Sequence, residues 1–398
     1  MASRRRTVAE HAGRIAALLG PVLAHQESEQ VPLAAALGRV TSEPVVTAGP
    51  LPPFRNAQMD GYAARWSDVR RTPVVLPVDG VQPAAAAATA TVLEPGHLLK
   101  VMTGAPVPTG ADCIVPVEQT LVESDGVRIL RGVDPGAYVR EAGSDALPGT
   151  VVVPSFTLLA PRHLAAAAAA GVAEVAVRRR PRVAVIATGA EVVPPGTPLS
   201  LGQVHDVNGT VLGALATEAG CETVLVDLTP DDPAAFEAAL ERAVAAADLV
   251  LTAGGVSKGD FEVVRQVLEP LGADVTEIAM QPGGPQGSAS VRGVPIICLP
   301  GNPVSAHVSF TVFLRPLLRT AAGLPPVAPM ELTLAAAVHS PKGKRQWLRG
   351  VVKDGTVYPV GGPGSHLVVA MAGADVLIDI PAEEDFVGAG SAVSVLPL

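Results

Sequence analysis

The sequence contains Val183-Ala-Val-Ile-Ala-Thr-Gly-Ala-Glu191, Asp248-Leu-Val-Leu-Thr-Ala-Gly-Gly-Val-Ser-Lys-Gly259 and Pro295-Ile-Ile-Cys-Leu-Pro-Gly-Asn-Pro303, three apolar runs that each stop at a glycine-rich turn. Such runs are typical of strands that are buried on both faces of a parallel sheet. Ligands of these sheets bind beyond the carboxyl ends of the strands. Glycine lets a ligand approach the backbone there, and exposed N–H groups attract anions. The three runs therefore predict one sheet with an anion-binding edge.

Helical patterns alternate with strands between residues 179 and 325. We expect helices from Asn208 to Ala219, from Asp232-Pro233 to about Ala247, from Glu262 to Leu268, and from Asn302-Pro303 to about Ala321. Asp and Pro suit the cap and first turn of a helix. Alternation of strands and helices predicts a central parallel α/β domain with right-handed crossovers.

The flanking segments have other patterns. Residues 49–139 contain short β-like segments separated by Pro and Gly turns, which predicts a small, inserted all-β domain. Residues 1–48 begin with an amphipathic helix, and residues 140–178 are extended and then helical. Residues 326–398 are again β-like, which predicts a small sheet or barrel. The chain is therefore expected to be multidomain, α/β plus β.

Composition excludes several functions. The formal charge is -9 and no basic stripe is present, which argues against nucleic-acid binding. The short arginine clusters at residues 4–6 and 178–180 are expected to be solvated flanks. Cys113, Cys221 and Cys298 are scattered and odd in number, as in a reduced cytoplasmic protein with buried thiols. No apolar stretch approaches the ~18 residues of a membrane span.

Three further segments carry polar groups. The residue types alone do not decide whether these groups are structural or functional. Asn56-Ala-Gln-Met-Asp-Gly-Tyr-Ala63 reads as a hairpin turn or a site. Met102-Thr-Gly-Ala-Pro-Val-Pro-Thr-Gly-Ala-Asp112 reads as a Pro/Gly loop between strands. In Arg140-Glu-Ala-Gly-Ser-Asp145 the guanidinium forms either a surface ion pair or a bidentate anion clamp.

Together with the glycine turns, these segments resemble the MoeA/gephyrin family of molybdopterin molybdenumtransferases over nearly the whole chain. Each motif is weak alone, but their order and spacing are specific. The motifs are Met59-Asp-Gly-Tyr-Ala63, Thr103-Gly-Ala-Pro-Val-Pro108, Thr188-Gly-Ala-Glu191, Gly254-Gly-Val-Ser257, Leu299-Pro-Gly-Asn-Pro-Val-Ser305, Gly343-Lys-Arg-Gln-Trp-Leu-Arg-Gly350 and Gly364-Ser-His366.

The resemblance implies an activity and an assembly. Family members take adenylylated molybdopterin and molybdate, and release molybdenum cofactor and AMP with a divalent metal such as Mg²⁺. They are homodimers whose site is completed across subunits, and their partners are a molybdopterin adenylyltransferase and acceptor molybdoenzymes. By the same resemblance, residues 1–48 with 140–178 are an elongated dimerisation region. Residues 179–325 are the molybdopterin-binding domain, and residues 326–398 are a C-terminal β-barrel.

The resemblance also implies catalytic roles for single residues. Asp60, Asp145 and Glu191 match functional carboxylates of the family, and Thr103 matches a hydroxyl at the site. We expect Asp60 and Glu191 to bind the metal or to orient the attacking group, because a phosphoanhydride is cleaved with a hard, oxygen-ligated cation. Glu262 stands where the family normally has an aspartate, and its extra methylene can shift the metal geometry.

Substrate-binding roles follow in the same way. Arg345 and Ser365 match positions that hold molybdate, a tetrahedral dianion suited to charge-assisted donors. The glycine turns and the helix that begins at Asn302-Pro303 are expected to hold the pterin phosphate and the pyrophosphate. The other expected substrate-binding residues are Arg140, Gly189, Asn208, Gly254, Gly255, Ser257, Gln281, Pro300, Gly301, Asn302 and Pro303.

One segment departs from the family pattern. Gln281-Pro-Gly-Gly-Pro285 stands where many relatives have Lys-Pro-Gly-Lys-Pro, so two cations beside the oxyanion are missing. The loss is expected to weaken molybdate binding by about 1–3 kcal/mol for each charged hydrogen bond. Gln281 still offers two N–H donors, and Lys258 is a partial substitute.

Other hypotheses remain open at this stage. The missing lysines also fit a non-catalytic paralogue that binds or carries the cofactor, while Asp60, Glu191 and Arg345 favour the enzyme. A related pterin adenylyltransferase is a third and weaker hypothesis, because the extra domains argue against it. His205, beside the first glycine turn, is either a ligand contact or part of a polar helix cap.

Overall fold

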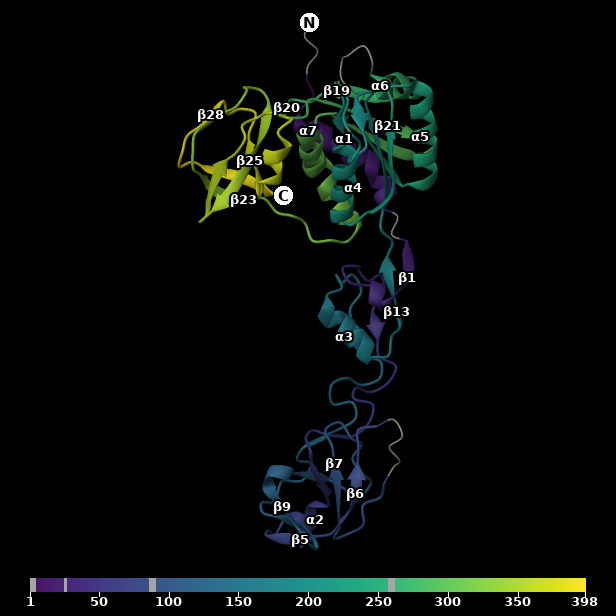
Figure 1. The fold of residues 1–398 in the computed structure, drawn as a ribbon, viewed down its shortest axis with the longest axis vertical. Coiled ribbons are helices and arrows are strands. Elements are labelled where there is room, and N and C mark those ends of the chain that lie inside the picture. The colour runs from purple at the N-terminus through teal and green to yellow at the C-terminus, as the bar shows by residue number, and fades with distance from the viewer. Residues whose placement is uncertain (1–4, 25–26, 86–90, 257–261) are drawn as a thin grey trace. The chain divides into compact units, whose positions relative to one another are not determined.

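The computed structural model describes residues 5–24, 27–85, 91–256 and 262–398. The chain divides into two compact units. One consists of Met1–Glu29 with Arg178–Leu398, and the other of Gln30–Val177 (Figure 1).

Helix α1 (Val8–Leu23) packs within the first unit. Ile15 and Leu19 are fully buried in the core there, and the helix begins at a capping box formed by Thr7 and Glu10. The amphipathic helix expected near the N-terminus is confirmed. The family resemblance groups residues 1–48 with 140–178, whereas α1 packs against the α/β core. The domain boundaries stay a prediction.

The first unit is built on a six-stranded sheet. Its strand order is β17 (Glu222–Thr229), β14 (Arg182–Thr188), β18 (Leu249–Ala253), β22 (Val294–Leu299), β21 (Pro285–Val291) and β19 (Asp274–Glu277). The first four strands are parallel, and three of them are the apolar runs of the sequence. The α/β fold class is confirmed.

The sheet is mixed rather than wholly parallel, because β21 runs antiparallel to β22 and β19 runs antiparallel to β21. The chain reverses at Arg292 and Gly293, whose φ angles of 51° and 84° form a two-residue hairpin turn. The sequence pattern predicts no strand at β21, since this segment is rich in Gly and Ser and poor in β-branched residues.

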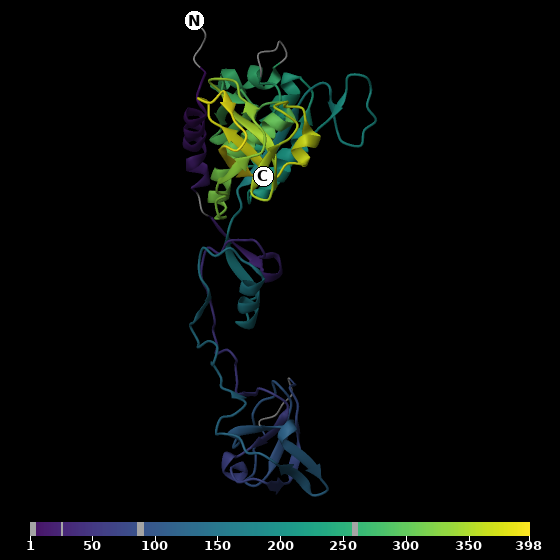
Figure 2. The same ribbon diagram turned by 90° about the vertical axis from the view of Figure 1, so that its left-hand side faces the viewer.

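Helices bury both faces of the sheet, which explains the continuous apolar runs. Val183 and Val185 of β14 face one cluster, with α1 and α4 (Asn208–Glu218). Ala184 and Ile186 face the opposite cluster, with α5 (Pro233–Ala246) and α6 (Val263–Leu268). In Figure 2 the purple helix α1 is seen along one side of the first unit. The predicted burial of both faces is confirmed.

The expected helix boundaries are also confirmed. The Asp232 side chain accepts a hydrogen bond from the N–H of Ala235 at 2.8 Å and caps α5. The last helical segment runs as α7 (Pro303–Ser309), the π-helical turn η4 (Phe310–Leu314) and α8 (Arg315–Ala321). It therefore begins after Asn302 and ends at Ala321, as its sequence predicts.

The C-terminal part of the first unit is a small closed barrel. Strands β25 (Arg345–Lys353), β26 (Thr356–Pro359), β23 (Met330–Leu334), β29 (Ala392–Pro397) and β27 (Val376–Ile380) pair in this order, and β27 pairs back to β25. A sixth strand, β20 (Met280–Gln281), pairs in parallel with the start of β25. The predicted barrel is confirmed, and β20 joins it to the chain segment before β21.

The second unit contains the predicted small β fold. Its larger sheet has the order β6 (Val78–Gln82), β7 (Leu98–Val101), β4 (Gly61–Ala64) and β8 (Cys113–Pro116), and a second sheet consists of β5 (Val74–Leu76), β10 (Gly126–Ile129) and β9 (Thr120–Glu123). Helix α3 (Pro161–Ala169) packs on β12 (Val151–Val153), which pairs with β2 (Val45–Val46).

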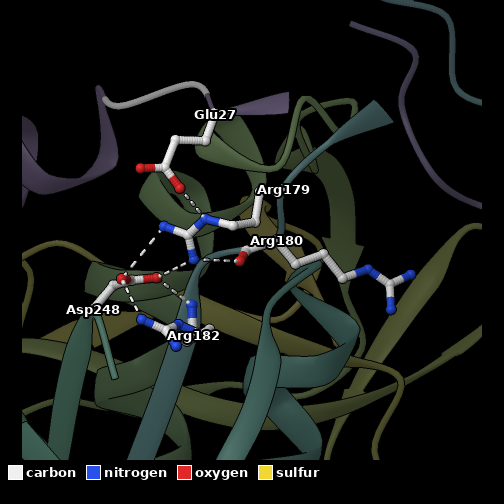
Figure 3. A network of polar contacts seen from close by, with 5 residues as sticks. All are labelled: Glu27, Arg179, Arg180, Arg182 and Asp248. Carbon is white, nitrogen blue, oxygen red and sulfur yellow. Dashed lines mark hydrogen bonds and ion pairs between the residues drawn. The ribbon is translucent and has the colours of Figure 1, made fainter. Parts of the chain in front are cut away.

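A charged network fixes the chain at the amino end of the parallel strands (Figure 3). Arg179 donates to Glu27 at 2.7 Å and to Asp248 at 2.9 Å, and the N–H of Arg182 donates to Asp248 at 2.8 Å. Burial alone would raise the pKa of Asp248, but these hydrogen bonds outweigh it and lower the pKa. The expectation of solvated arginine flanks is therefore wrong for Arg179, which is a structural ion-pair partner.

Cys113, Cys221 and Cys298 are free and buried, as expected, and burial raises the pKa of each thiol to about 12. In the part of the chain that the structure describes, no helix is long and apolar enough to cross a membrane.

Candidate active site

A cleft of about 710 Å³ lies at the carboxyl ends of β14, β18 and β22 in the first unit. Residues of all three glycine turns line it. The edge of the sheet that the sequence predicts to bind anions therefore carries a cavity. The expected residues that line it are Gly189, Glu191, Asn208, Gly254, Gly255, Glu262, Gln281, Pro300, Gly301, Asn302, Pro303 and Ser365. Ser257 lies outside the described residues.

Gly254 and Gly255 of the second glycine turn cannot be replaced by residues that carry a side chain. Gly254 and Gly255 have φ angles of 97° and 62°, in the left-handed region that favours glycine. A Cβ atom on Gly254 would lie 2.7 Å from the carbonyl oxygen of Thr188, and one on Gly255 would lie 3.0 Å from the backbone N of Val264. The turn therefore lets the backbone itself form the wall of the cleft.

Two buried acceptors of the cleft have no partner among the described residues. Asn208 donates through Nδ2 to the carbonyl of Gly301 at 2.7 Å, which ties the start of α4 to the third glycine turn. Its Oδ1 is buried without a hydrogen bond, and so is the Oγ1 of Thr188. Buried polar atoms are normally satisfied, so these two atoms are suited to a ligand donor.

The segment after β20 forms another wall. Gln281 accepts a hydrogen bond from Nε2 of Gln346 at 2.6 Å, so its oxygen is engaged and its N–H donors remain. A Cβ atom on Gly284 would lie 2.5 Å from Oε1 of Glu277. The carboxylate of Glu277 thus occupies the space that a lysine at position 284 would need.

A buried network of hydrogen bonds stabilises the segment after β20 that forms this wall of the cleft. Gln286 donates to the carbonyl of Gly283 at 2.8 Å and to Oγ of Ser309 at 2.9 Å, and its oxygen faces Nε2 of His11 at 3.1 Å. The imidazole must donate to this oxygen, so Nε2 carries the proton. Burial lowers the pKa of His11 to about 4, which keeps the ring neutral.

Ser365 reaches the cleft on a loop of the barrel. The loop is fixed by Arg349, which is 2% exposed and donates to the carbonyls of Gly362 and Gly364. The carbonyl of Ser365 in turn accepts the N–H of Val304 at 3.1 Å, in the first turn of α7. These bonds connect the barrel loop to the third glycine turn.

Arg345 does not line the cleft. Its guanidinium binds Asp379 in a bidentate pair, with Nε to Oδ1 at 2.7 Å and Nη2 to Oδ2 at 2.5 Å, and lies over the ring of Trp347. Its expected contact with molybdate stays a prediction. The residue before it, Lys344, does line the cleft.

Glu191 and Glu262 line the cleft as predicted, and Asp206, Asp231 and Glu277 line it as well. Asp206 accepts the N–H of Gly209, and Asp231 accepts the N–H of Ala190, each at 2.9 Å. No three His, Cys, Asp or Glu side chains of the described residues cluster as a metal site. Mg²⁺ commonly uses one or two carboxylates together with substrate phosphates, so this donor set fits it.

The remaining predicted residues, Asp60, Thr103, Arg140 and Asp145, lie in the second unit. Oδ1 of Asp60 accepts the N–H of Thr103 at 2.7 Å and its hydroxyl at 2.9 Å. The backbone hydrogen bond and then the hydroxyl lower the pKa of Asp60, which holds it ionised. The structure thus pairs the two motifs that contain these residues.

Arg140 and Asp145 are exposed and are not paired with each other. Arg140 lies in β11 (Val139–Arg140), opposite Asn56 of β3 (Asn56–Ala57). The backbone N–H of Asp145 donates to the carbonyl of Leu51 at 2.9 Å. His205 is exposed at the rim of the cleft, where its Nε2 donates to the carbonyl of Thr197 at 2.9 Å.

Sequence reasoning missed several residues of the cleft. Lys344, which lines the cleft, and Arg349, which fixes one of its loops, both stand in a quoted motif. They are five positions apart, so strand alternation puts them on opposite faces and gives no common signal for the two. Nothing in the sequence pattern indicates that Gln286 is buried, because glutamine is mostly exposed in proteins and this one stands in a Gly/Ser-rich segment.

Comparison with known proteins divides the chain into three regions. A model of the MoeA N-terminal region (domain I and II) matches residues 6–171, a probable molybdopterin binding domain matches 184–320, and the MoeA C-terminal region (domain IV) matches 331–398. The chain is 44% identical to molybdopterin molybdenumtransferase 2 of Mycobacterium tuberculosis over 92% of this chain and 94% of the relative. It is 36% identical to molybdopterin molybdenumtransferase of Nostoc, over 94% and 89%.

A solved structure is similar over almost the whole length. The molybdopterin biosynthesis MoeA protein of Pyrococcus horikosii superposes with a TM-score of 0.78 at 31% identity, covering 96% of this chain and 98% of that protein.

Proposed function

This chain belongs to the MoeA family of molybdopterin molybdenumtransferases, and we propose that the cleft of its first unit is where molybdate enters adenylylated molybdopterin. The protein is an enzyme of molybdenum cofactor biosynthesis, and its products are molybdenum cofactor and AMP. One observation carries the placement of the reaction: a single cleft gathers the three glycine turns with Ser365. The non-catalytic alternative is not favoured, because relatives with the enzyme's name match over nearly the full length.

In this proposal the sheet edge binds the pterin and its phosphates. The glycine turns bring the backbone close to the phosphates. The unpartnered oxygens of Asn208 and Thr188 accept N–H groups of the pterin, which removes the cost of leaving them unsatisfied. Ser365 and the N–H groups of Gln281 donate to molybdate.

The carboxylates assist the cleavage of the phosphoanhydride. Glu191 and Glu262 lie in the cleft, and Asp60 is held ionised by Thr103 in the second unit. We assign Glu191 to a divalent cation such as Mg²⁺, which when bound would neutralise phosphate charge, and the proposed metal role of Asp60 rests on the family resemblance alone. Glu262 is a second catalytic carboxylate of the cleft, and the catalytic role proposed for Asp145 of the second unit rests on the family resemblance.

We also propose a homodimer in the cytoplasm, in line with the family and with the buried, free thiols. Sedimentation or light scattering of the purified chain should give twice the mass of 40.4 kDa. A monomer at micromolar concentration would contradict the dimer.

Turnover tests the activity itself. The purified protein, given adenylylated molybdopterin, Mg²⁺ and molybdate, should release many equivalents of AMP per chain. Stoichiometric binding without AMP release would instead support the carrier.

A further inference from the structure

Residues 6–14 of the first unit pair with one wall of the cleft, the wall segment of residues 277–285. The N–H of Arg6 donates to the carbonyl of Glu277 at 3.1 Å, and the N–H of Ala279 donates to the carbonyl of Arg6 at 2.8 Å. Arg6 thus forms a parallel bridge with Ile278, directly after β19. Because β19 lies at the edge of the six-stranded sheet, Arg6 satisfies backbone groups that would otherwise bond to water.

Two arginines of residues 6–14 converge on one carboxylate of β19. Arg6 donates through Nη2 to Oδ2 of Asp274 at 2.8 Å, and Nε of Arg14 lies 2.5 Å from the same oxygen. The side chains of Arg6 and Asp274 are only 21% and 24% exposed. A charged hydrogen bond that is withdrawn from water in this way contributes more than an exposed surface pair. The ion pairs therefore fix residues 6–14 against the start of β19.

Residues 6–14 also hold the other end of the wall segment. Nε2 of His11 faces the side-chain oxygen of Gln286, and Gln286 donates to the carbonyl of Gly283. The cleft-lining residues 280–282 lie between this attachment and the bridge at Arg6. One short stretch of chain is thus attached on both sides of the residues that face the cleft.

The wall segment has little regular structure of its own. Strand β20 contains only two residues, and Pro282-Gly-Gly-Pro285 follows it. Glycine loses more conformational freedom on folding than any other residue, so such a segment is ordered by its contacts. The position of the wall segment therefore depends on its attachments, which are the barrel strand β25 and residues 6–14.

We propose that residues 6–14 position the wall segment for catalysis, and that the ion pair between Arg6 and Asp274 is the contact that does so. The inference rests on the proposed function for the reaction that the wall serves. In the part of the chain that the structure describes, residues 6–14 line no part of the cleft, so Arg6 is a positioning residue. Loosening the wall leaves the cleft competent in a fraction of the molecules, which raises KM by the inverse of that fraction.

The kinetic test compares Arg6→Ala and Arg6→Lys with the matched control Arg242→Ala. Arg242 pairs with Asp227 of β17, at the opposite edge of the same sheet, so its loss removes an ion pair that is remote from the wall segment. In initial rates of AMP release, Arg6→Ala should raise the KM for molybdate about 5- to 20-fold, the effect of one partly exposed charged hydrogen bond.

The value of kcat should stay within about twofold in Arg6→Ala, because a bound substrate selects the ordered wall. Arg6→Lys keeps the positive charge and should recover most of the loss. Arg242→Ala should behave as the unmodified protein. Thermal melting confirms that each variant is folded at the assay temperature.

Hydrogen exchange at single amides reports on the wall segment itself. The N–H of Ile278 donates to the carbonyl of Gly284 at 2.7 Å, and the N–H of Ala279 donates to Arg6. Both amides should exchange about 5- to 20-fold faster in Arg6→Ala, because local opening of the wall becomes easier. Arg242→Ala should leave both exchange rates unchanged, although it too removes an ion pair from the fold.

Several results would overturn the inference. An unchanged KM for molybdate in folded Arg6→Ala is one, and unchanged exchange at Ile278 and Ala279 is another. An equal rise in KM in Arg242→Ala would show a general loss of stability instead of positioning. If the unmodified protein releases no AMP, the proposed function fails, and the exchange rates of the two amides then decide the inference alone.

Discussion

The side-chain amide of Gln286 donates to the carbonyl of Gly283 at 2.8 Å, and so connects a wall of the cleft to helix α1 through His11. Gln286 is fully buried, and Gly283 has a φ angle of 105°. A Cβ atom on Gly283 would lie 2.8 Å from Oγ of Ser309, so the wall is packed tightly against this network. The shape of the cleft therefore depends on residues that never touch a ligand.

Replacing Gln286 by Leu should destabilise the protein by about 3 kcal/mol, because buried acceptors and donors on Gly283, Ser309 and His11 lose their partner. Denaturant unfolding measures the loss. Gln266→Leu, on the exposed face of α6, is the matched control and should change stability by less than about 0.5 kcal/mol. Equal stability of the two variants would show that the network contributes nothing.

The neutral state of His11 predicts a pH dependence of stability. Its pKa is about 4 in the folded protein and 6.5 in the unfolded chain, so between these values only the unfolded chain binds the proton. The stabilisation is complete above pH 6.5 and is lost as the pH falls toward 4, by at most about 3 kcal/mol.

Free energies of unfolding at several pH values test this dependence. His11→Gln should flatten the slope between pH 6.5 and 4. His307, whose pKa burial also lowers to about 4, should leave part of the slope in place. An identical slope in His11→Gln and the unmodified protein would mean that His11 titrates normally in the folded state.

Asp60 and Thr103 should act as a pair. Asp60→Ala should abolish molybdate-dependent AMP release without unfolding the protein, because Asp60 is exposed. Thr103→Val keeps the backbone donor but removes the hydroxyl, so the pKa of Asp60 should rise toward its ordinary value and activity should fall on the acid side. The rate of AMP release against pH measures both effects, and an unaffected rate in Asp60→Ala would remove this residue from the mechanism.

The missing lysines can be restored one at a time. Gln281→Lys should lower the KM for molybdate, since it adds a cation at the cleft. Gly284→Lys should give less benefit or lower the stability, because its Cβ atom needs the space of the Glu277 carboxylate. Combining Gly284→Lys with Glu277→Ala should recover the benefit. No gain in molybdate affinity from Gln281→Lys would refute the account of the missing charges.

The parts of the fold that sequence predicts well are those governed by local pattern. Val183 to Thr188 read as a buried strand because helices cover both faces, and Asp232 caps α5 as its type suggests. The antiparallel strand β21 was missed, because its Gly and Ser residues have little β propensity and pairing with β22 decides its structure.

The residues of the candidate site also fall into those that local sequence pattern predicts and those that it does not. Glycine turns at strand ends indicated the cleft, since topology brings the carboxyl ends of parallel strands to one edge. Lys344 and Gln286 could not be found so easily. Their roles depend on the pairing of β20 with β25 and on the packing of α1, and both contacts join residues far apart in the sequence. Asp60 and Thr103 were found through their motifs, but only the structure pairs them.

We propose that the cleft at the carboxyl ends of β14, β18 and β22 is the active site. The most direct test is the initial rate of molybdate-dependent AMP release in Glu191→Gln, with Glu222→Gln as control, since Glu222 is exposed and does not line the cleft. We predict a rate at least 100-fold below that of the unmodified protein for Glu191→Gln, as expected for a group acting on the transition state, and an unchanged rate for Glu222→Gln. Equal rates in the two folded variants would contradict the claim.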